Sequence, residues 1–412
     1  MRVIRKRCLG LDLHKKQHTA YLRVHQGSDQ EPIGIREEFS TMPEDLERLR
    51  QWVIDHEVTD VVMESTGVYW MHLYELLEDV TRPAVVNASH VKKVPGRKTD
   101  ITDAEWLAEL HAHGLLRTSF VPPKDIRRLR ALTRYRSKLV AIRTNARNRT
   151  IKLVEMAGVK LSSVATDSFG MTGRIILNGL CKEGANPAEL AAQAKGKLRL
   201  KIPALVKALQ HPLDAHQREL LTLHLQAHDL IDAQIAQVEL KLAQSSTPYA
   251  MAIEKLDAIP GINALGAITL LAETGVDMSV YRSDRHLTAI AGLAPGNAIS
   301  SDKRRRIAVR KGNHHLKRIC VQMAWAASRT KDSFLRARFL RLQTRIGHNK
   351  AIVALARQLL VLVFHVLSTG RPYTDRGPNF YQVRDTTRAV QRAVKRLAHL
   401  GFVATLTKKT DG

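Results

Sequence analysis

Apolar and polar residues change their spacing twice along the chain, and each change indicates a different kind of structure. In residues 1–115, short apolar or alternating runs are separated by segments with helical spacing. The runs predict strands over 3–13, 19–24, 33–39, 60–63 and 83–86, and the spacing between them predicts helices over 43–56, 69–77 and 103–113. Three strands followed by alternating helices and strands favour a mixed sheet covered by helices. We expect an α/β domain over residues 1–118.

Residues 119–248 have the spacing of long paired helices. One apolar seam steps by three and four residues with arginines on its outer faces, at Leu132, Tyr135, Leu139, Ile142 and Ala146. A second helix, over 213–242, ends in a similar seam at Ile231, Ile235, Val238 and Leu242. With a mixed segment at 160–212 between them, the two helices predict an antiparallel coiled-coil arm.

Residues 249–372 predict a third, helical domain. Residues 256–270 have the form of two helices around Pro260-Gly261, as in a helix-hairpin-helix, where Gly261 can adopt a positive φ. The following helix N-terminus offers free N–H groups to a phosphate. The apolar run 359–367 is under half a bilayer span and contains His365, so we expect a buried helix. Residues 373–412 form a basic tail with a short amphipathic helix near 387–400. The fold class is therefore α/β plus all-α.

The charge of the chain indicates a polyanionic partner. Lys plus Arg outnumber Asp plus Glu by 65 to 39, giving a net charge of +26. Repulsion between these positive charges disfavours the compact fold unless a polyanion offsets it. Nucleic acid fits better than an anionic membrane, because the sequence has no membrane-length apolar run. The three cysteines form no CxxC pair, and the N-terminal residues lack a secretory signal. We expect a cytoplasmic protein.

Four acids stand out in this basic chain: Asp12, Glu64, Asp100 and Asp103. Asp12 lies within the first predicted strand and Glu64 ends the fourth, while the other two share one face at the start of a helix. Metal-assisted phosphoryl chemistry needs hard oxygen ligands on rigid elements. Together the four acids could hold two Mg²⁺ ions about 3.5–4 Å apart.

Each acid also has a plainer interpretation. Asp100 or Thr102 can cap the helix, and Asp103 suits a helix first turn. Glu64 can be an ordinary carboxylate at a strand end. Asp12 is harder to explain this way, because a carboxylate amid leucines is unfavourable without a charged partner.

A serine lies beside the most basic stretch of the chain. Ser300 and Ser301 precede the cations Lys303, Arg304, Arg305, Arg306, Arg310 and Lys311. An alcohol next to positive charge has what nucleophilic attack on a phosphodiester requires. The alternative is a solvated basic loop in which both serines are turn residues.

Two further groups of cations are expected to contact nucleic acid. The first precedes Asp100, at Lys92, Lys93, Arg97 and Lys98. The second lies on the predicted arm, at Arg127, Arg128, Arg134, Arg143 and Arg147. The arm region 121–160 has twelve Lys or Arg against two acids, so we expect it to contact nucleic acid.

Several blocks of the sequence together resemble one family. DLHKKQH, MESTGVYW and KTDITDAEWLAEL, followed by IPGINALGAITLLAE, AGLAP and VRKGNHHLKR, are similar to the DEDD transposases of insertion sequences of the IS110 type. The resemblance implies a RuvC-like, RNase H-type domain with its acidic tetrad at Asp12, Glu64, Asp100 and Asp103, and a nucleophilic serine at Ser300. The family usually has Ser-Gly where this chain has Ser300-Ser301, so Ser301 stays a possible nucleophile.

The same resemblance implies site-specific recombination of donor and target DNA, directed by a structured bridge RNA. On this interpretation Ser300 attacks a DNA phosphate at a composite site that also contains the metal-bound acids. Two chains of a homodimer or homotetramer can form this site together, one supplying the serine and the other the acids. Such a protein is cytoplasmic in a bacterium or archaeon and associated with the nucleoid. Two alternatives remain: a RuvC-type junction nuclease that cuts without a covalent intermediate, and a non-catalytic nucleic-acid-binding protein.

Overall fold

The computed structural model describes residues 2–26, 30–65, 67–91, 94, 102–294, 299–300, 303–304, 312–403 and 405 of the 412-residue chain. For residues 89–90, 299–300 and 303–304 the description covers the backbone. The chain divides into two compact units, Met1–Lys124 and Asp125–Gly412, and each has its own hydrophobic cores.

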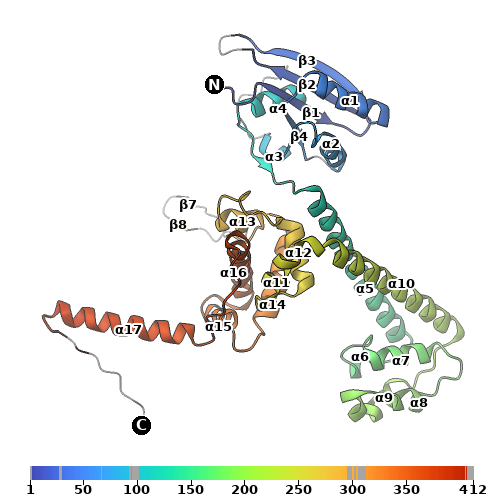
Figure 1. Ribbon diagram of the computed structural model, residues 1–412. Helices are drawn as coiled ribbons and strands as arrows, with labels where there is room; N and C mark the ends of the chain where they lie inside the picture. Colours follow the sequence, from blue (N-terminus) through green and yellow to red (C-terminus); the bar gives the residue numbers. More distant parts are fainter. Residues whose placement is uncertain are drawn as a thin grey trace. The chain divides into compact units, whose positions relative to one another are not determined.

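Unit 1 is built on a six-stranded mixed sheet with the order β3-β2-β1-β4-β5-β6 (Figure 1). Its strands are β1 (Arg7–Leu13), β2 (Gln17–Val24), β3 (Ile33–Ser40), β4 (Asp60–Glu64), β5 (Arg82–Val86) and β6 (Thr118–Ser119). The first three pair antiparallel, β1, β4 and β5 pair parallel, and β6 pairs antiparallel with β5. The mixed sheet is confirmed. The strand predicted from residue 3 was wrong at its start, because the amide of Ile4 donates to the carbonyl of Ala112 on a helix (2.9 Å).

The alternation of side chains along β1 decides which helices cover each face of the sheet. Leu9, Leu11 and Leu13 point to one face, where they form a core with α1 (Pro43–Asp55) and α2 (Tyr69–Leu77). Successive strand residues point to opposite faces, so Gly10 and Asp12 lie on the other face. That face is covered by α3 (Ala88–Val91) and α4 (Asp103–Ala112).

Helix α4 lies directly on β1 at Gly10. A Cβ added to Gly10 would stand 2.0 Å from the carbonyl oxygen of Ala104 and 2.8 Å from the amide nitrogen of Ala108. Ile4, three residues before β1, meets the other end of the helix, because its amide donates to the carbonyl of Ala112. The helix therefore runs antiparallel to β1, and its N-terminus faces the C-terminal end of that strand.

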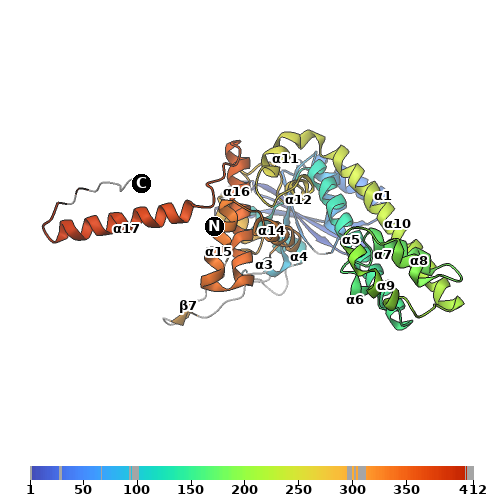
Figure 2. The ribbon, with the colours of Figure 1, turned by 90° about the horizontal axis from the view of Figure 1, so that it is seen from below.

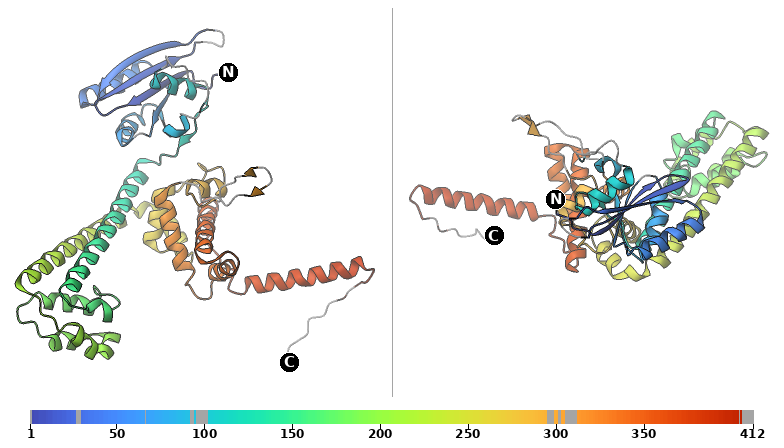
Figure 3. Two further views of the ribbon diagram at one scale, coloured as in Figure 1. Left: turned by 180° about the vertical axis from the view of Figure 1, so that it is seen from behind. Right: turned by 90° about the horizontal axis from the view of Figure 1, so that it is seen from above.

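Unit 2 begins with the predicted antiparallel arm, made of α5 (Lys124–Met156) and α10 (Ala215–Ser245), which lie side by side in every view (Figures 1 and 3). The predicted seam of α10 is confirmed at Ile235, Val238 and Leu242, which pack with α5 and α12. The seam predicted for α5 was partly wrong. Tyr135 is 49% exposed and Ile142 is 41% exposed, because arginines of α5 face α10 instead.

The segment predicted as mixed folds into a small helical bundle at the end of the arm (Figures 2 and 3). Its elements are α6 (Leu161–Val164), α7 (Met171–Leu180), α8 (Pro187–Ala192), the 3₁₀ helix η1 (Gly196–Lys201) and α9 (Ile202–Ala208). Their apolar residues share one core with Val154 of α5 and with Leu221 and Leu225 of α10. The arm thus ends in a packed body, which the sequence pattern did not predict.

The rest of unit 2 is helical. After the 3₁₀ helix η2 (Thr247–Tyr249) it contains α11 (Ala250–Asp257), α12 (Ala264–Thr274), α13 (Asp284–Ile290), α14 (His314–Ala327), α15 (Phe334–Ile346), α16 (His348–Thr369) and α17 (Phe380–His399), with the short strands β7 (Ile299–Ser300) and β8 (Lys303–Arg304). α16 is long and apolar enough to span a membrane by length and composition. It contacts α11, α13, α14 and α15, and Leu359, Leu360 and Val363 are buried, so the predicted buried helix is confirmed.

The turn between α11 and α12 has the predicted form. Gly261 has φ +90°, a conformation that favours glycine, and a Cβ there would lie 2.5 Å from the amide nitrogen of Ala327 on α14. Asn263 caps α12 by accepting a hydrogen bond from the amide of Gly266 (2.9 Å). Gly261 therefore packs the turn against α14, and one of the N–H groups expected to meet a phosphate already has a partner.

Gly10→Ala tests whether the contact of α4 with β1 fixes unit 1. Alanine in a strand would ordinarily stabilise the fold by reducing the freedom of the unfolded chain. Here its Cβ meets backbone, so we expect the free energy of unfolding in urea to fall by about 3 kcal/mol. Gly34→Ala is the comparison, because its Cβ meets the end of the Tyr21 side chain and no backbone, so we expect a smaller decrease. Equal decreases in both variants would contradict the prediction.

Candidate active site

The pairing of β1 with β4 brings two of the predicted acids to one edge of the sheet. These strands are parallel, with Gly10 beside Val62 and Leu11 beside Met63. One step further in the same register stand Asp12 and Glu64. Asp12 lies on the same face of the sheet as Gly10, and Glu64 lies on the same face as Val62. Val62 packs with residues of α4, so this is the face that α4 covers. Both acids therefore lie at the C-terminal ends of neighbouring strands, on the face that α4 covers.

The third acid, Asp103, reaches this edge from the helix. It is the first residue of α4 and is exposed, and Thr102 caps the helix by accepting a hydrogen bond from the amide of Glu105 (3.3 Å). Since α4 runs antiparallel to β1, its first turn lies toward the strand end that carries Asp12. Asp100, the fourth predicted acid, lies outside the described residues, as do Lys92, Lys93, Arg97 and Lys98.

Polar contacts with β2 hold α4 in this position. Arg23 forms an ion pair with Glu109 (4.0 Å). Burial, followed by the charge and hydrogen bond of Glu105, raises the pKa of the Tyr21 hydroxyl. Tyr21 and Arg23 face the same side of the sheet as Gly10, so they fix the helix along its length.

Asp12 is a half-buried carboxylate beside a histidine. Its side chain is 29% exposed, and Oδ2 lies 3.1 Å from Nε2 of His14. Among the described residues, no group of three or more His, Cys, Asp or Glu side chains is close enough to hold a metal ion. The described acids alone therefore do not form a closed metal site. Their oxygen donors, gathered at one sheet edge, are of the kind that hard divalent cations prefer.

The serine-bearing segment contains a short antiparallel ladder. The backbone of Ser300 on β7 pairs with that of Lys303 on β8, and Ile299 pairs with Arg304. The remaining predicted residues of this segment, Ser301, Arg305, Arg306, Arg310 and Lys311, lie outside the part that the structure describes.

The chain leaves for this segment and returns from it at one place, which we call the loop base (Gly292–Ala294 with Gly312–Asn313). The amides of Leu293 and Ala294 both donate to the carbonyl of Thr288 (2.9 and 3.2 Å), and the amide of Asn313 donates to that of Ile290 (2.8 Å). A Cβ on Gly312 would stand 2.4 Å from the amide nitrogen of Gly292. The two ends of the segment are therefore packed backbone to backbone at the end of α13.

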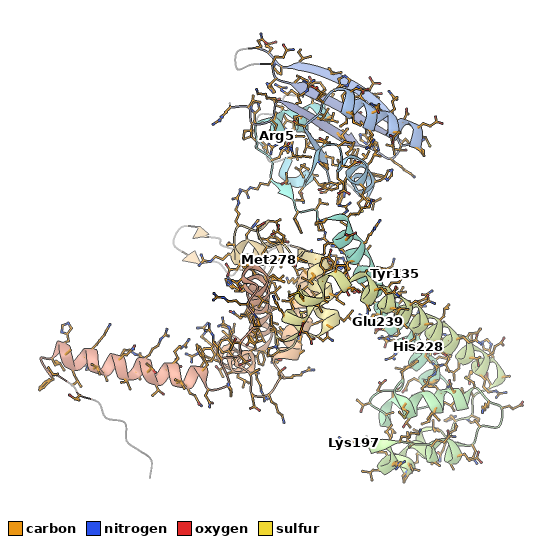
Figure 4. The ribbon with its side chains drawn as sticks, viewed as in Figure 1. Arg5, Tyr135, Lys197, His228, Glu239 and Met278 are labelled. Carbon is orange, nitrogen blue, oxygen red and sulfur yellow. The ribbon has the colours of Figure 1, made fainter. Side chains whose placement is uncertain are left out.

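Several arginines of the arm already have partners within the protein. Arg143 pairs with Asp232 of α10 (2.8 Å), Arg147 donates to His228 (3.0 Å), and Arg134 pairs with Glu273 of α12 (2.8 Å). Figure 4 marks Tyr135 on α5 and Glu239 and His228 on α10. Of the other two predicted arginines, Arg127 is half-buried, and Arg128 is 68% exposed with Asp125 at 3.8 Å. Contact of these five residues with nucleic acid stays a prediction.

The sequence interpretation missed Glu273. Its side chain is 1% exposed, and it accepts hydrogen bonds from Arg134 of α5 and from Asn313 at the loop base. The signal was present in the run Leu270-Leu271-Ala272-Glu273, because a carboxylate in an apolar helix needs a charged partner.

Two family models match the chain. A DEDD model of the IS110 type, described as "Transposase", matches residues 9–157, and a model described as "Transposase IS116/IS110/IS902 family" matches residues 253–339. The first match includes all four predicted acids, and the second includes Ser300. Such a DEDD family implies a divalent metal, and the mixed sheet with its helices is RNase H-like.

Two curated proteins are similar to this chain. One is the transposase for insertion sequence element IS1111A of Coxiella burnetii (strain RSA 493 / Nine Mile phase I), 26% identical over 325 residues, which are 76% of this chain and 79% of that protein. The other is the insertion element IS110 uncharacterized 43.6 kDa protein of Streptomyces coelicolor, 34% identical over 134 residues, 30% of each chain.

Proposed function

The chain belongs to the IS110 family of transposases, which are DNA phosphoryl-transfer enzymes, and on this premise we propose that a serine and metal-bound acids share the reaction. Membership excludes the hypothesis of a non-catalytic binding protein. In our proposal Asp12, Glu64, Asp100 and Asp103 hold two Mg²⁺ ions, and Ser300 is the nucleophile. The observation that carries it is the register of β1 and β4, which brings Asp12 and Glu64 to the strand edge that the start of α4 faces.

In the first step the Oγ of Ser300 attacks a DNA phosphorus. A P–Oγ bond forms, the bond from phosphorus to the 3′ oxygen breaks, and the serine proton is transferred so that a free 3′-hydroxyl is left. The phosphoserine keeps the energy of the broken ester, so that the 3′-hydroxyl of another strand can attack it without a high-energy cofactor. Bound Mg²⁺ would supply a Lewis acid for the phosphate oxygens. Lys303, the register partner of Ser300, and the other cations of this segment would favour the negative charge that develops in the reaction.

We further propose that a bridge RNA selects the donor and target DNA. Base pairing then reads the sequence, and the protein needs mainly contacts with nucleic-acid backbones. The net charge of +26 and the exposed cations of α5 support this proposal. A homodimer or homotetramer, in which one chain completes the site of another, would act in the bacterial cytoplasm and at the nucleoid.

Ser300→Ala tests the nucleophile. The full-length protein with its co-purified RNA and donor DNA is denatured, and covalent protein–DNA adduct is measured on a gel. We expect adduct to disappear while DNA binding stays unchanged, because the substitution removes one oxygen and no charge. Ser301→Ala is the matched control and should retain adduct.

Two results would contradict this assignment. Adduct that persists in Ser300→Ala and disappears in Ser301→Ala would move the nucleophile to Ser301. DNA cleavage without adduct in the unchanged protein would favour the hydrolytic mechanism of a RuvC-type nuclease.

Asp12→Asn tests the metal site by stability. In the unchanged protein we expect Mg²⁺ or Mn²⁺ at about 100 times its Kd to raise the free energy of unfolding by about 2–3 kcal/mol. The variant should lose most of this gain. Without metal it should be at least as stable as the unchanged protein, since one of several neighbouring negative charges is removed. Asp55→Asn, at the exposed end of α1, should keep the full metal effect. A variant that loses stability without metal yet keeps the metal effect would make Asp12 a structural acid.

The exposed side of α5 is tested by the salt dependence of RNA binding. The double variant Arg128→Gln/Lys138→Gln, at two exposed positions, should bind the co-purified RNA with a less steep slope of log affinity against log salt. The slope should fall by about 0.7–0.9 for each phosphate that the protein no longer neutralises. Arg36→Gln on β3, a similarly exposed position, should leave the slope unchanged. An unchanged slope in the double variant would show that this end of α5 does not contact RNA.

A further inference from the structure

Glu273 connects three elements of unit 2 through one buried carboxylate. It lies in the last turn of α12, and both carboxylate oxygens accept from the guanidinium of Arg134 on α5 (2.8 and 2.9 Å). Oε2 also accepts from the side-chain amide of Asn313 (2.7 Å). Arg130, one turn earlier on α5, donates to the carbonyls of Ala272 and Glu273 (2.8 and 3.0 Å).

These contacts keep Glu273 ionised. Burial alone would raise the pKa of its carboxyl group, but the hydrogen bonds from Arg134 and Asn313 and the charges of Arg134 and Arg130 outweigh burial and hold that pKa below its usual value. Burial, and then the charge of Arg134, lower the pKa of the adjacent His315 to about 4. At neutral pH His315 is therefore uncharged, and the two arginines are the cations that face Glu273.

A buried ion pair is a weak source of stability, since apolar residues of the same volume often serve as well. An ion pair of this kind contributes a defined geometry between the elements that it joins. The guanidinium of Arg134 presents two parallel N–H groups to one carboxylate, which fixes both the distance and the angle between α5 and α12. The third bond then fixes Asn313 relative to this pair.

Asn313 is the residue at which the serine-bearing segment returns to the fold. Its side-chain nitrogen donates to the carboxylate of Glu273, and its side-chain oxygen accepts from the backbone amides of His315 and Leu316 at the start of α14. Its backbone amide donates to the carbonyl of Ile290. Both side-chain groups and the backbone amide of Asn313 therefore hold the loop base, and the side-chain nitrogen connects it through Glu273 to the arm.

We infer that Glu273 is a positioning residue for the nucleophilic serine: it ties the loop base, and with it the segment that carries Ser300, to helix α5 of the arm. This inference rests on the proposed role of Ser300. Glu273 does not act on DNA. It sets where the serine stands relative to the helix whose exposed cations face the polyanion, so removing the tie lowers the rate of attack and leaves binding unchanged.

The first test compares Glu273→Gln with Glu239→Gln in the full-length protein. Glu239 of α10 also pairs with an arginine of α5, Arg136, but lies on the other helix of the arm rather than at the loop base. For Glu273→Gln we expect faster amide hydrogen exchange at residues 288–294 and 312–317. We also expect a rate of adduct formation at saturating DNA that is about 10–100-fold lower, with an unchanged Kd for DNA. Glu239→Gln should show neither effect.

A second pair of variants addresses the case in which Glu273→Gln fails to fold. Asn313→Ser keeps a helix-capping oxygen but cannot reach Glu273, so it should lower the adduct rate and preserve α14. Asn313→Asp should lower the rate further by opposing two carboxylates. The double variant Glu273→Gln/Asn313→Asp exchanges donor and acceptor between the same two positions, and we expect it to recover part of the rate.

The outcomes separate this inference from the proposed function. If Glu273→Gln and Asn313→Ser both form adduct at the unchanged rate, the positioning role is overturned and the serine nucleophile stands. If the exchange rates at the loop base match those of Glu239→Gln, the tie itself is absent. If the unchanged protein forms no adduct at all, the proposal that Ser300 is the nucleophile is wrong, and so is the positioning role that depends on it.

Discussion

The close contact of α4 with β1 determines where the acids of unit 1 lie. Only a residue without a side chain allows the backbone of a helix to approach a strand as closely as Ala104 and Ala108 approach Gly10. Because the helix runs antiparallel to the strand, its first turn faces the end of β1 that carries Asp12. The parallel register with β4 adds Glu64 to the same face. Three acids that are far apart in the sequence are thus brought to one edge by one glycine contact and one strand register.

Much of unit 1 could be predicted because its signals are local. The leucines at 9, 11 and 13 alternate with Gly10 and Asp12, and this period of two identifies both the strand and its buried face. The two-residue strand β6 and the four-residue helix α3 were missed, since elements so short contain no full period. The short helices of 160–212 escaped prediction for the same reason, although their apolar residues form a complete core.

The candidate site likewise has parts that local sequence signals predict and parts that they do not. The acids could be found because carboxylates are conspicuous beside apolar strands and in a basic chain. The loop base could not, because it depends on contacts between residues far apart in sequence, such as Arg134 with Glu273 and Gly312 with Gly292. Periodicity also misassigned part of α5. It treats every arginine as outward-facing, whereas Arg136 and Arg143 face acids of α10 and leave Tyr135 and Ile142 exposed.

The arginines of α5 therefore belong to two electrostatic classes. Five half-buried arginines meet partners on α10 or α12, namely Arg130, Arg134, Arg136, Arg143 and Arg147. The charges of the arginines that face Glu273, Glu239 and Asp232 largely serve the packing of the arm, because each acid cancels most of the field at a distance. Exposed cations on other sides of the helix carry the field outward, at Lys124, Arg128, Lys138, Arg149 and Lys152. A polyanion that binds the exposed cations need not break the internal pairs, so the tie from Arg134 through Glu273 to the loop base can persist while the arm is occupied.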